Sequence, residues 1–218
     1  MLKPYKYRLI CFIGIDGSGK TTLSQNIVQE FERKNMDVKY SYSKFRPVFS
    51  KPIVVLGKYL FLKDNIREYE NYSNSKRAQI RKHNLLAKIY KKLILWDYYI
   101  QIIYKIKLPL SRGKIVVCDR YVYDTAINDI PREDNNKITV NQHIEEMLDF
   151  APSPDLIFLI DLPESVAFQR KDDTPSLYYL KERREIYQWL SRMYAMEIID
   201  GTKNMAEIEN DVKRRLLL

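Results

Sequence analysis

Residues 14–21, GIDGSGKT, have the types and the spacing of a loop that wraps around a chain of phosphates. They match the pattern G-x-x-x-x-G-K-[ST], in which glycines let the backbone turn so that successive N–H groups face phosphate oxygens. In this pattern Lys20 can neutralise the β- and γ-phosphates, and Thr21 can ligate Mg²⁺. We therefore predict a site for a nucleoside triphosphate and Mg²⁺, and the features below favour ATP as the nucleotide. The predicted ATP-binding residues are Gly14, Asp16, Gly17, Ser18, Gly19, Lys20, Thr21 and Thr22.

A second candidate pair, Asp119 and Arg120, follows the apolar run of residues 115–118. If that run is a strand of a parallel sheet, both side chains lie at its carboxyl end, where such sheets bind their ligands. Arg120 could clamp a phosphate. Asp119 could join Thr21 at the metal and orient Mg²⁺ through water, or accept a proton from the acceptor. The alternative is a structural ion pair at the end of a strand.

Short apolar runs alternate with helical patterns along the chain. The runs at residues 8–14, 113–119 and 156–160 are typical of strands buried on both faces. Between them, apolar residues recur at steps of three and four, most clearly over residues 86–104. This alternation predicts an α/β fold with a parallel sheet and helices on both faces. We find no internal repeat or linker, so residues 1–218 are expected to form a single domain.

The composition is that of a globular protein, with 45% hydrophobic and 30% charged residues in a chain of 218. Two cysteines make no disulfide framework, so we expect a reducing, cytoplasmic environment. The most apolar stretch, residues 93–106, is too short and too polar to span a bilayer. The net charge of +9 favours acidic partners without choosing among nucleotides, nucleic acid and anionic lipid.

Other features narrow the class of protein. The sequence has neither an NKxD guanine-specificity motif nor an LSGGQ-like transporter signature. A short chain with this phosphate loop, an Asp-Arg pair after a strand and a late arginine-rich segment indicates a small phosphotransferase.

Four segments resemble thymidylate kinases. GIDGSGKTT resembles the phosphate loop of that family, and DRY at residues 119–121 is similar to its DR[YH] motif. PDLIFLIDLPESVAFQR looks like its late strand and the helix leading into its lid, and IIDGTKNMAEIENDV resembles its C-terminal strand, loop and closing helix. The resemblance spans nearly the whole chain. It implies a three-layer P-loop NTPase fold with a helical lid, and a transferase of nucleotide biosynthesis that phosphorylates dTMP with ATP.

The resemblance also implies roles for individual residues. Asp16 would face the sugar 3′-hydroxyl of the acceptor, and Arg120 would bridge the acceptor phosphate and the transferred phosphoryl group. A lid over about residues 170–185 would close over ATP and supply arginine to the developing charge. For Arg183 and Arg184, the alternative to a catalytic role is that both side chains lie on a solvated face of a helix. The implied catalytic residues are Lys20, Asp119, Arg120 and Arg170, and the lid cations are Arg170, Lys171, Arg183 and Arg184.

The middle of the chain, about residues 45–110, departs from the family pattern. In place of a TREPGGT-like segment it reads YSYSKFRPVFSKP, where Arg46 could serve the acceptor phosphate. Tyr99 stands where the family carries a base-reading arginine, so residues 96–99 could form an aromatic pocket with the Asp97 carboxylate. The alternative is that Trp96 and Tyr99 belong to a core stripe. The predicted acceptor-binding residues are Asp16, Arg46, Asp97, Tyr99, Arg120 and Tyr121.

Two other functions stay open from the sequence. One is a kinase of the same fold that acts on another nucleotide, a nucleoside or a phosphorylated metabolite. The other is a nucleotide- or nucleic-acid-binding protein without turnover, which the net charge favours. We expect small nucleotides as partners, neither nucleic acid nor a membrane. Related enzymes are often homodimers, and a helix over residues 76–107 could supply that contact.

Overall fold

The computed structural model describes residues 5–51, 84–130, 136–171 and 174–218. The beginning of the helix expected from residue 76 and part of the expected acceptor region lie outside the described residues. Within the described residues, no helix combines the length and the apolarity needed to cross a membrane.

The described residues contain a fully parallel five-stranded sheet with the order β2-β3-β1-β4-β5. Every residue of the neighbouring inner strands β1 and β3 is buried, as their continuous apolar runs predict. The strands are β1 (Leu9–Ile13), β2 (Val38–Tyr42), β3 (Ile115–Asp119), β4 (Leu156–Asp161) and β5 (Glu197–Asp200). The expected α/β fold with a parallel sheet is confirmed.

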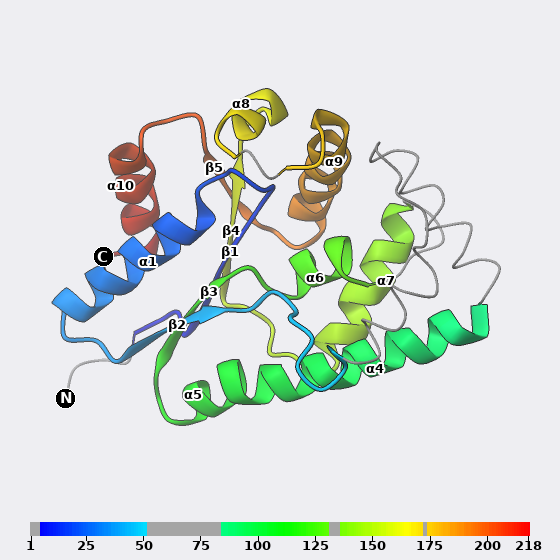
Figure 1. The fold of residues 1–218 in the computed structure, drawn as a ribbon. Coiled ribbons are helices and arrows are strands. Elements are labelled where there is room, and N and C mark those ends of the chain that lie inside the picture. The colour runs from blue at the N-terminus through cyan, green and yellow to red at the C-terminus, as the bar shows by residue number, and fades with distance from the viewer. Residues whose placement is uncertain (1–4, 52–83, 131–135, 172–173) are drawn as a thin grey trace.

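Two helices, α1 (Lys20–Arg33) and α10 (Met205–Leu216), cover one face of the sheet (Figure 1). Leu23, Ile27 and Phe31 of α1 recur at steps of four and are almost fully buried. They share one apolar cluster with Phe12 and Phe158, which belong to neighbouring strands. This packing fixes the direction in which α1 leaves the phosphate loop.

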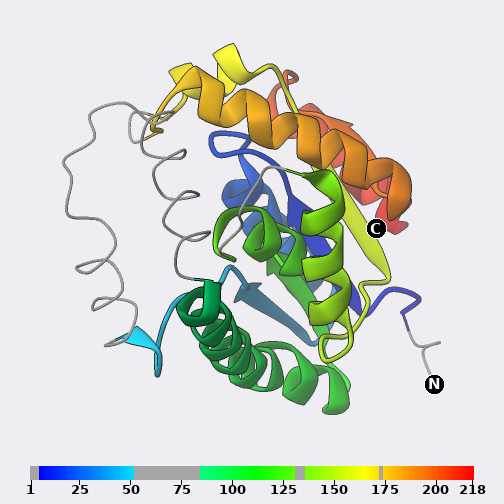
Figure 2. The ribbon, with the colours of Figure 1, turned by 90° about the vertical axis from the view of Figure 1, so that its right-hand side faces the viewer.

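The other face of the sheet is covered by α4 (Asn84–Ile102), α6 (Val122–Asn128), α7 (Lys137–Leu148) and α9 (Leu177–Met193), with the short α8 (Glu164–Gln169) at the end of β4. Figure 2 shows α4 along one side of this layer and α9 along the other, with α6 and α7 between them. Helices therefore cover both faces, which completes the three layers.

The helix α4 continues through a π-helical segment, η1 (Ile103–Lys107), into α5 (Leu108–Ser111). Pro109 has no N–H for the carbonyl group one turn earlier, and this is a sufficient reason for the wider turn before it. Gly113, in a left-handed conformation with φ 88°, then leads into β3. The helical stretch therefore ends at Ser111, a few residues beyond the expected residue 107.

Candidate active site

The phosphate loop, residues 14–21, connects the carboxyl end of β1 to the first turn of α1. Gly14 and Gly17 have positive φ angles of 142° and 83°, which side chains rarely adopt. A Cβ atom would lie 2.6 Å from the Ile160 carbonyl oxygen at Gly14, and 2.3 Å from the Ala167 carbonyl oxygen at Gly17. Both glycines are therefore required by the turn itself and by the backbone packed against it.

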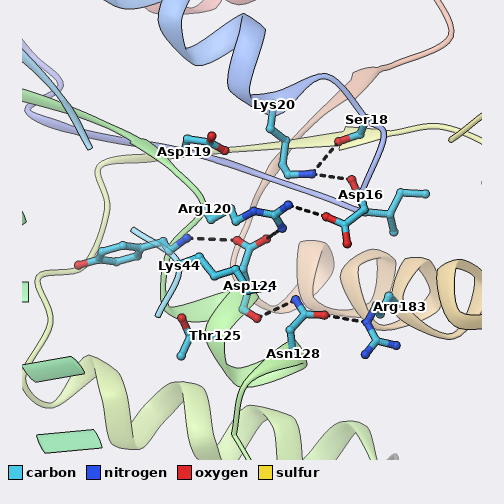
Figure 3. A network of polar contacts seen from close by, with 12 residues as sticks. Asp16, Ser18, Lys20, Lys44, Asp119, Arg120, Asp124, Thr125, Asn128 and Arg183 are labelled. Carbon is cyan, nitrogen blue, oxygen red and sulfur yellow. Dashed lines mark hydrogen bonds and ion pairs between the residues drawn. The ribbon is translucent and has the colours of Figure 1, made fainter. Parts of the chain in front are cut away.

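Lys20 is 4% exposed and folds back over its own loop. Its ammonium group donates hydrogen bonds to the Ile15 carbonyl oxygen at 2.5 Å and to Ser18 Oγ at 3.1 Å (Figure 3). Burial and the nearby Arg120 charge lower the pKa of Lys20 to about 8, although three aspartates oppose this change. The cation thus lies inside the loop, where it can move onto a phosphate group.

Arg120 connects the end of β3 to the phosphate loop. β1 and β3 are neighbours in the sheet, and the Arg120 N–H donates to the Phe12 carbonyl oxygen at 2.9 Å. The guanidinium forms ion pairs with Asp16 at 2.5 Å and with Asp124 at 3.3 Å (Figure 3). Asp124 also accepts hydrogen bonds from the Tyr187 hydroxyl at 2.7 Å and from the Tyr121 N–H at 3.1 Å.

Two carboxylates thus flank one arginine, but their environments differ. Burial raises the pKa of Asp124, and this effect outweighs the Arg120 charge beside it. Burial also opposes ionisation of Asp16, yet the charges of Arg120 and Lys20 hold its pKa well below the usual range. Burial disfavours the charged form of Arg120 as well, but Asp124 and Asp16 raise its pKa further. Arg120 is a permanent cation in this site, and Asp16 a permanent anion.

Asp119 and Thr21 form a separate oxygen-rich group. The Thr21 hydroxyl donates to Asp119 Oδ2 at 2.5 Å, and the Tyr40 hydroxyl donates to the same oxygen at 3.0 Å. Oδ1 of Asp119 is buried and has no hydrogen-bond partner among the described residues. A buried carboxylate oxygen without a partner is costly unless a water or a cation satisfies it. This donor set, a hydroxyl backed by a carboxylate, fits hydrated Mg²⁺.

Two of the four expected lid cations, Lys171 and Arg183, lie near Asp16 or near Tyr179, which contacts Asp16. Lys171 lies close enough for its charge to lower the pKa of Asp16. The Arg183 guanidinium stacks over the Tyr179 ring, 3.5 Å from its centroid, and Nε donates to Asn128 at 2.7 Å. Tyr179 in turn donates to Asp16 at 3.4 Å. α9 therefore carries Arg183 and Tyr179 to the same side of the site as Arg120.

The other two expected lid cations, Arg184 and Arg170, bind groups outside the phosphate loop. Arg184 forms a bidentate pair with Asp161 at 2.8 and 3.1 Å and also contacts Glu164 at 3.0 Å. The structure therefore places Arg184 in an ion-pair network at the end of β4 and not at the phosphate loop. Arg170 donates to the Gly201 carbonyl oxygen at 3.1 Å.

Thr22, an expected ATP-binding residue, is exposed on the first turn of α1.

The structure does not bring all the predicted acceptor residues to the phosphate loop. The Tyr121 side chain is buried, and its hydroxyl donates to the Pro152 carbonyl oxygen at 2.8 Å. Tyr99 packs edge-on against Phe150, with ring centroids 5.4 Å apart. Trp96 and Tyr99 are 55% and 38% exposed, so neither belongs to a core stripe, the other interpretation of these residues. Helical phase explains this, because the neighbouring Tyr98 takes the core position.

Arg46 and Asp97 belong to the segment that follows β2. Arg46 is exposed and its guanidinium lies over the Tyr42 ring, 4.4 Å from the centroid. Asp97 is fully buried and accepts hydrogen bonds from the backbone of Val48 and Ser50 at 2.9 Å each. Burial opposes ionisation of Asp97, but these bonds and others from Ser50 and Gln101 lower its pKa. Both carboxylate oxygens of Asp97 therefore bind other groups, and Asp97 fixes the segment around Val48 and Ser50 instead of facing the phosphate loop.

Several residues of the site were not predicted from the sequence. Asp124 lies four residues after Arg120 in DRYVYD, and this helical spacing is a signal that could have identified it. Tyr40, Tyr179 and Tyr187 carry no comparable signal, because they reach the site only through the pairing of β2 with β3 and the packing of α9.

Comparisons with known proteins find a matching family model and related sequences. A family model described as thymidylate kinase matches residues 59–214. The chain is 26% identical over 207 residues to a probable thymidylate kinase of Pyrococcus abyssi, covering 91% of this chain and 90% of the relative. It is 25% identical over 215 residues to thymidylate kinase of Plasmodium falciparum (97% and 90%). It is 26% identical over 226 residues to thymidylate kinase of Leptospira interrogans (95% and 92%).

Proposed function

Because the chain belongs to the thymidylate kinase family, we propose that it transfers the γ-phosphoryl group of ATP to dTMP and forms ADP and dTDP. The observation that carries this proposal is the ion pair between Arg120 and Asp16, which joins the end of β3 to the phosphate loop. It places one permanent cation where a donor phosphate on the loop and an acceptor phosphate would meet.

On the donor side, the loop N–H groups and the N-terminus of α1 would hold the phosphates of ATP. Lys20 would leave the Ile15 carbonyl oxygen and Ser18 and bind the β- and γ-phosphates. Thr21, with Asp119 behind it, would hold Mg²⁺, which neutralises phosphate charge when bound. These groups lower the repulsion that an attacking phosphate meets.

On the acceptor side, we infer that Arg46 and Arg120 bind the phosphate of dTMP, and that Asp16 accepts a hydrogen bond from the sugar 3′-hydroxyl. The low pKa of Asp16 keeps it an acceptor at neutral pH. An acceptor phosphate is already a nucleophile near neutral pH, so no strong general base is needed. Positioning and charge stabilisation would supply the rate enhancement.

We propose that residues 1–218 act as one catalytic unit, with about residues 45–110 on the acceptor side and about residues 170–185 as a lid. Lys171 and Arg183 support this lid, because the first acts on Asp16 through its charge and the second stacks on Tyr179 beside it. Arg170, at the end of α8, would reach ATP only by leaving the Gly201 carbonyl oxygen.

Binding of ATP is expected to weaken as the pH rises above 8. The pKa of Lys20 in the free protein is about 8, and bound phosphates would raise it toward or beyond its ordinary value. ATP binding then takes up a proton, and affinity falls by up to about tenfold per pH unit above 8. Below that pH, Lys20 is already charged and this contribution is constant.

Calorimetric titration with Mg·ATP between pH 7 and 9.5 measures this dependence. A Lys20→Arg variant is the matched control, because arginine stays protonated throughout this range. An equal fall in affinity in the variant and in the parent protein would contradict the assignment to Lys20.

The acceptor is tested by ADP release from Mg·ATP with dTMP, dUMP, the other monophosphates and free nucleosides. Clear preference for dTMP supports the proposed function. Preference for another acceptor would favour a different kinase of the same fold. Salt-sensitive binding of nucleic acid without ADP release would favour the non-catalytic alternative.

We further propose a homodimer formed through α4. Large apolar side chains are exposed on this helix and on the neighbouring loop: Leu85 (72%), Ile89 (48%), Trp96 (55%), Val48 (57%) and Phe49 (58%). Their number on one surface is typical of an interface. Sedimentation at increasing concentration should show twice the chain mass, and the mass of a single chain at all concentrations would contradict the dimer.

We also infer a cytoplasmic location, where ATP is available and where the two free cysteines, Cys11 and Cys118, stay reduced. Cell fractionation tests this inference.

A further inference from the structure

Three polar side chains interrupt the apolar stretch of residues 93–106, in α4 and η1, at intervals of four residues: Asp97, Gln101 and Lys105. This spacing places them on one side of the helix, and we call them the polar ladder. Asp97 is 0% exposed and Gln101 is 7% exposed. Burial of a carboxylate and an amide is costly unless each is hydrogen-bonded, so this arrangement needs an explanation.

The ladder residues bind one another in a fixed direction. Lys105 Nζ donates to Gln101 Oε1 at 3.1 Å, and Gln101 Nε2 donates to Asp97 Oδ1 at 3.0 Å. An ammonium on one side and a carboxylate on the other determine which way the Gln101 amide points. The ladder is therefore a polarised chain with a single orientation of the amide.

The same three side chains bind the segment that follows β2. Lys105 donates to the Tyr42 carbonyl oxygen at 3.3 Å, and Gln101 donates to the Arg46 carbonyl oxygen at 2.7 Å. Asp97 accepts from the N–H and the hydroxyl of Ser50, at 2.9 and 2.7 Å, as well as from the Val48 N–H. Successive steps of the ladder thus hold the backbone from residue 42 to residue 50.

The opposite side of this segment contacts the end of β3 and α6. The Ser43 N–H donates to the Asp119 carbonyl oxygen at 3.0 Å, and the Phe45 N–H donates to Thr125 Oγ1 at 3.2 Å. Figure 3 shows Lys44 and Thr125 beside the network that contains Arg120. The segment is thus fixed between α4 and the catalytic edge of the sheet, while Arg46 itself stays exposed.

We propose that the polar ladder positions Arg46 for the acceptor phosphate, with Gln101 as the central positioning residue. The inference rests on the proposed function, because it assigns Arg46 to dTMP. Gln101 binds the main-chain carbonyl oxygen of Arg46, so the ladder acts on the acceptor through the backbone of residues 42–50. The phosphate loop of the donor site is held by β1 and α1, and the hydrogen-bond partners of the ladder lie in residues 42–50 and in the ladder itself.

Gln101→Glu tests the proposal with almost no change in side-chain volume. A carboxylate at this position cannot donate to the Arg46 carbonyl oxygen or to Asp97, so two hydrogen bonds are lost. The KM for dTMP should rise about tenfold, while the KM for ATP stays within about twofold. Lys92→Gln, on an exposed side of the same helix, makes the same change in charge and should leave both KM values unchanged.

Two further variants keep the test decisive if Gln101→Glu folds poorly. Ser50→Ala removes one bond to Asp97 from the loop side and should raise the dTMP KM by a smaller factor of about threefold. In an Arg46→Ala background, the effect of either ladder variant on the dTMP KM should largely disappear, because both act through Arg46.

An equal change in both KM values, or additive effects with Arg46→Ala, would overturn the proposal. Failure of the proposed function would look different, since the unmodified protein would then release no ADP with dTMP.

Discussion

Replacement of Lys20 by alanine is expected to lower turnover of ATP and dTMP by about 10²- to 10³-fold or more. Lys20 is the cation of the phosphate loop, and its ammonium lies against the Ile15 carbonyl oxygen and Ser18, within reach of a bound phosphate. Its charge becomes more important as negative charge develops during transfer, so kcat should fall more than the affinity for ATP.

The fold should tolerate this change. Lys20 is buried and its charge is disfavoured there by burial and by Arg120, so alanine removes an unfavourable charge. The melting temperature should stay close to that of the parent protein. Lys34→Ala, at the exposed C-terminal end of α1, is the control and should retain full turnover. Normal steady-state turnover by Lys20→Ala would refute the donor site described above.

Replacement of Arg120 is the second change with a large expected effect. Arg120→Ala should lower turnover about 10³-fold, because it removes the cation shared by the donor and acceptor sides. It should also lower the melting temperature, because Asp124 is fully buried and loses its charged partner. Loss of one partner of a buried ion pair typically costs about 3–5 kcal/mol.

Arg120→Lys separates the two effects. Lysine keeps a positive charge for Asp16 and Asp124 but cannot hold two groups in the fixed planar geometry of a guanidinium. We expect stability nearer to the parent protein and turnover still reduced about 10²-fold. Steady-state kinetics and thermal melts of both variants measure this difference. Turnover of the lysine variant within a few-fold of the parent would show that Arg120 is only a structural partner of the two aspartates.

The sequence predicts the sheet and the phosphate loop well because both depend on local information. The strands β1, β3 and β4 are almost continuous apolar runs, and the loop glycines are required by backbone geometry at their own positions. β1 and β3 then bring Arg120 to the loop, since parallel strands end at the same edge of the sheet. The comparison with the DRY motif already indicated this residue.

Other features depend on helix phase and distant partners, which the sequence does not reveal. Arg183 and Arg184 are adjacent in the chain, yet one stacks on Tyr179 while the other pairs with Asp161. A rotation of about 100° between successive helix residues separates them. In the same way Asp97 was expected to line an acceptor pocket, but its partners are Val48 and Ser50, almost fifty residues earlier.

The most direct test of the central claim is to follow the phosphorus NMR spectrum of Mg·ATP and dTMP after the protein is added. The dTMP signal should decline while signals of dTDP and ADP grow in equal amounts, and with Lys20→Ala the same change should be at least about 10²-fold slower. Unchanged dTMP, or release of inorganic phosphate in place of dTDP, would contradict the claim.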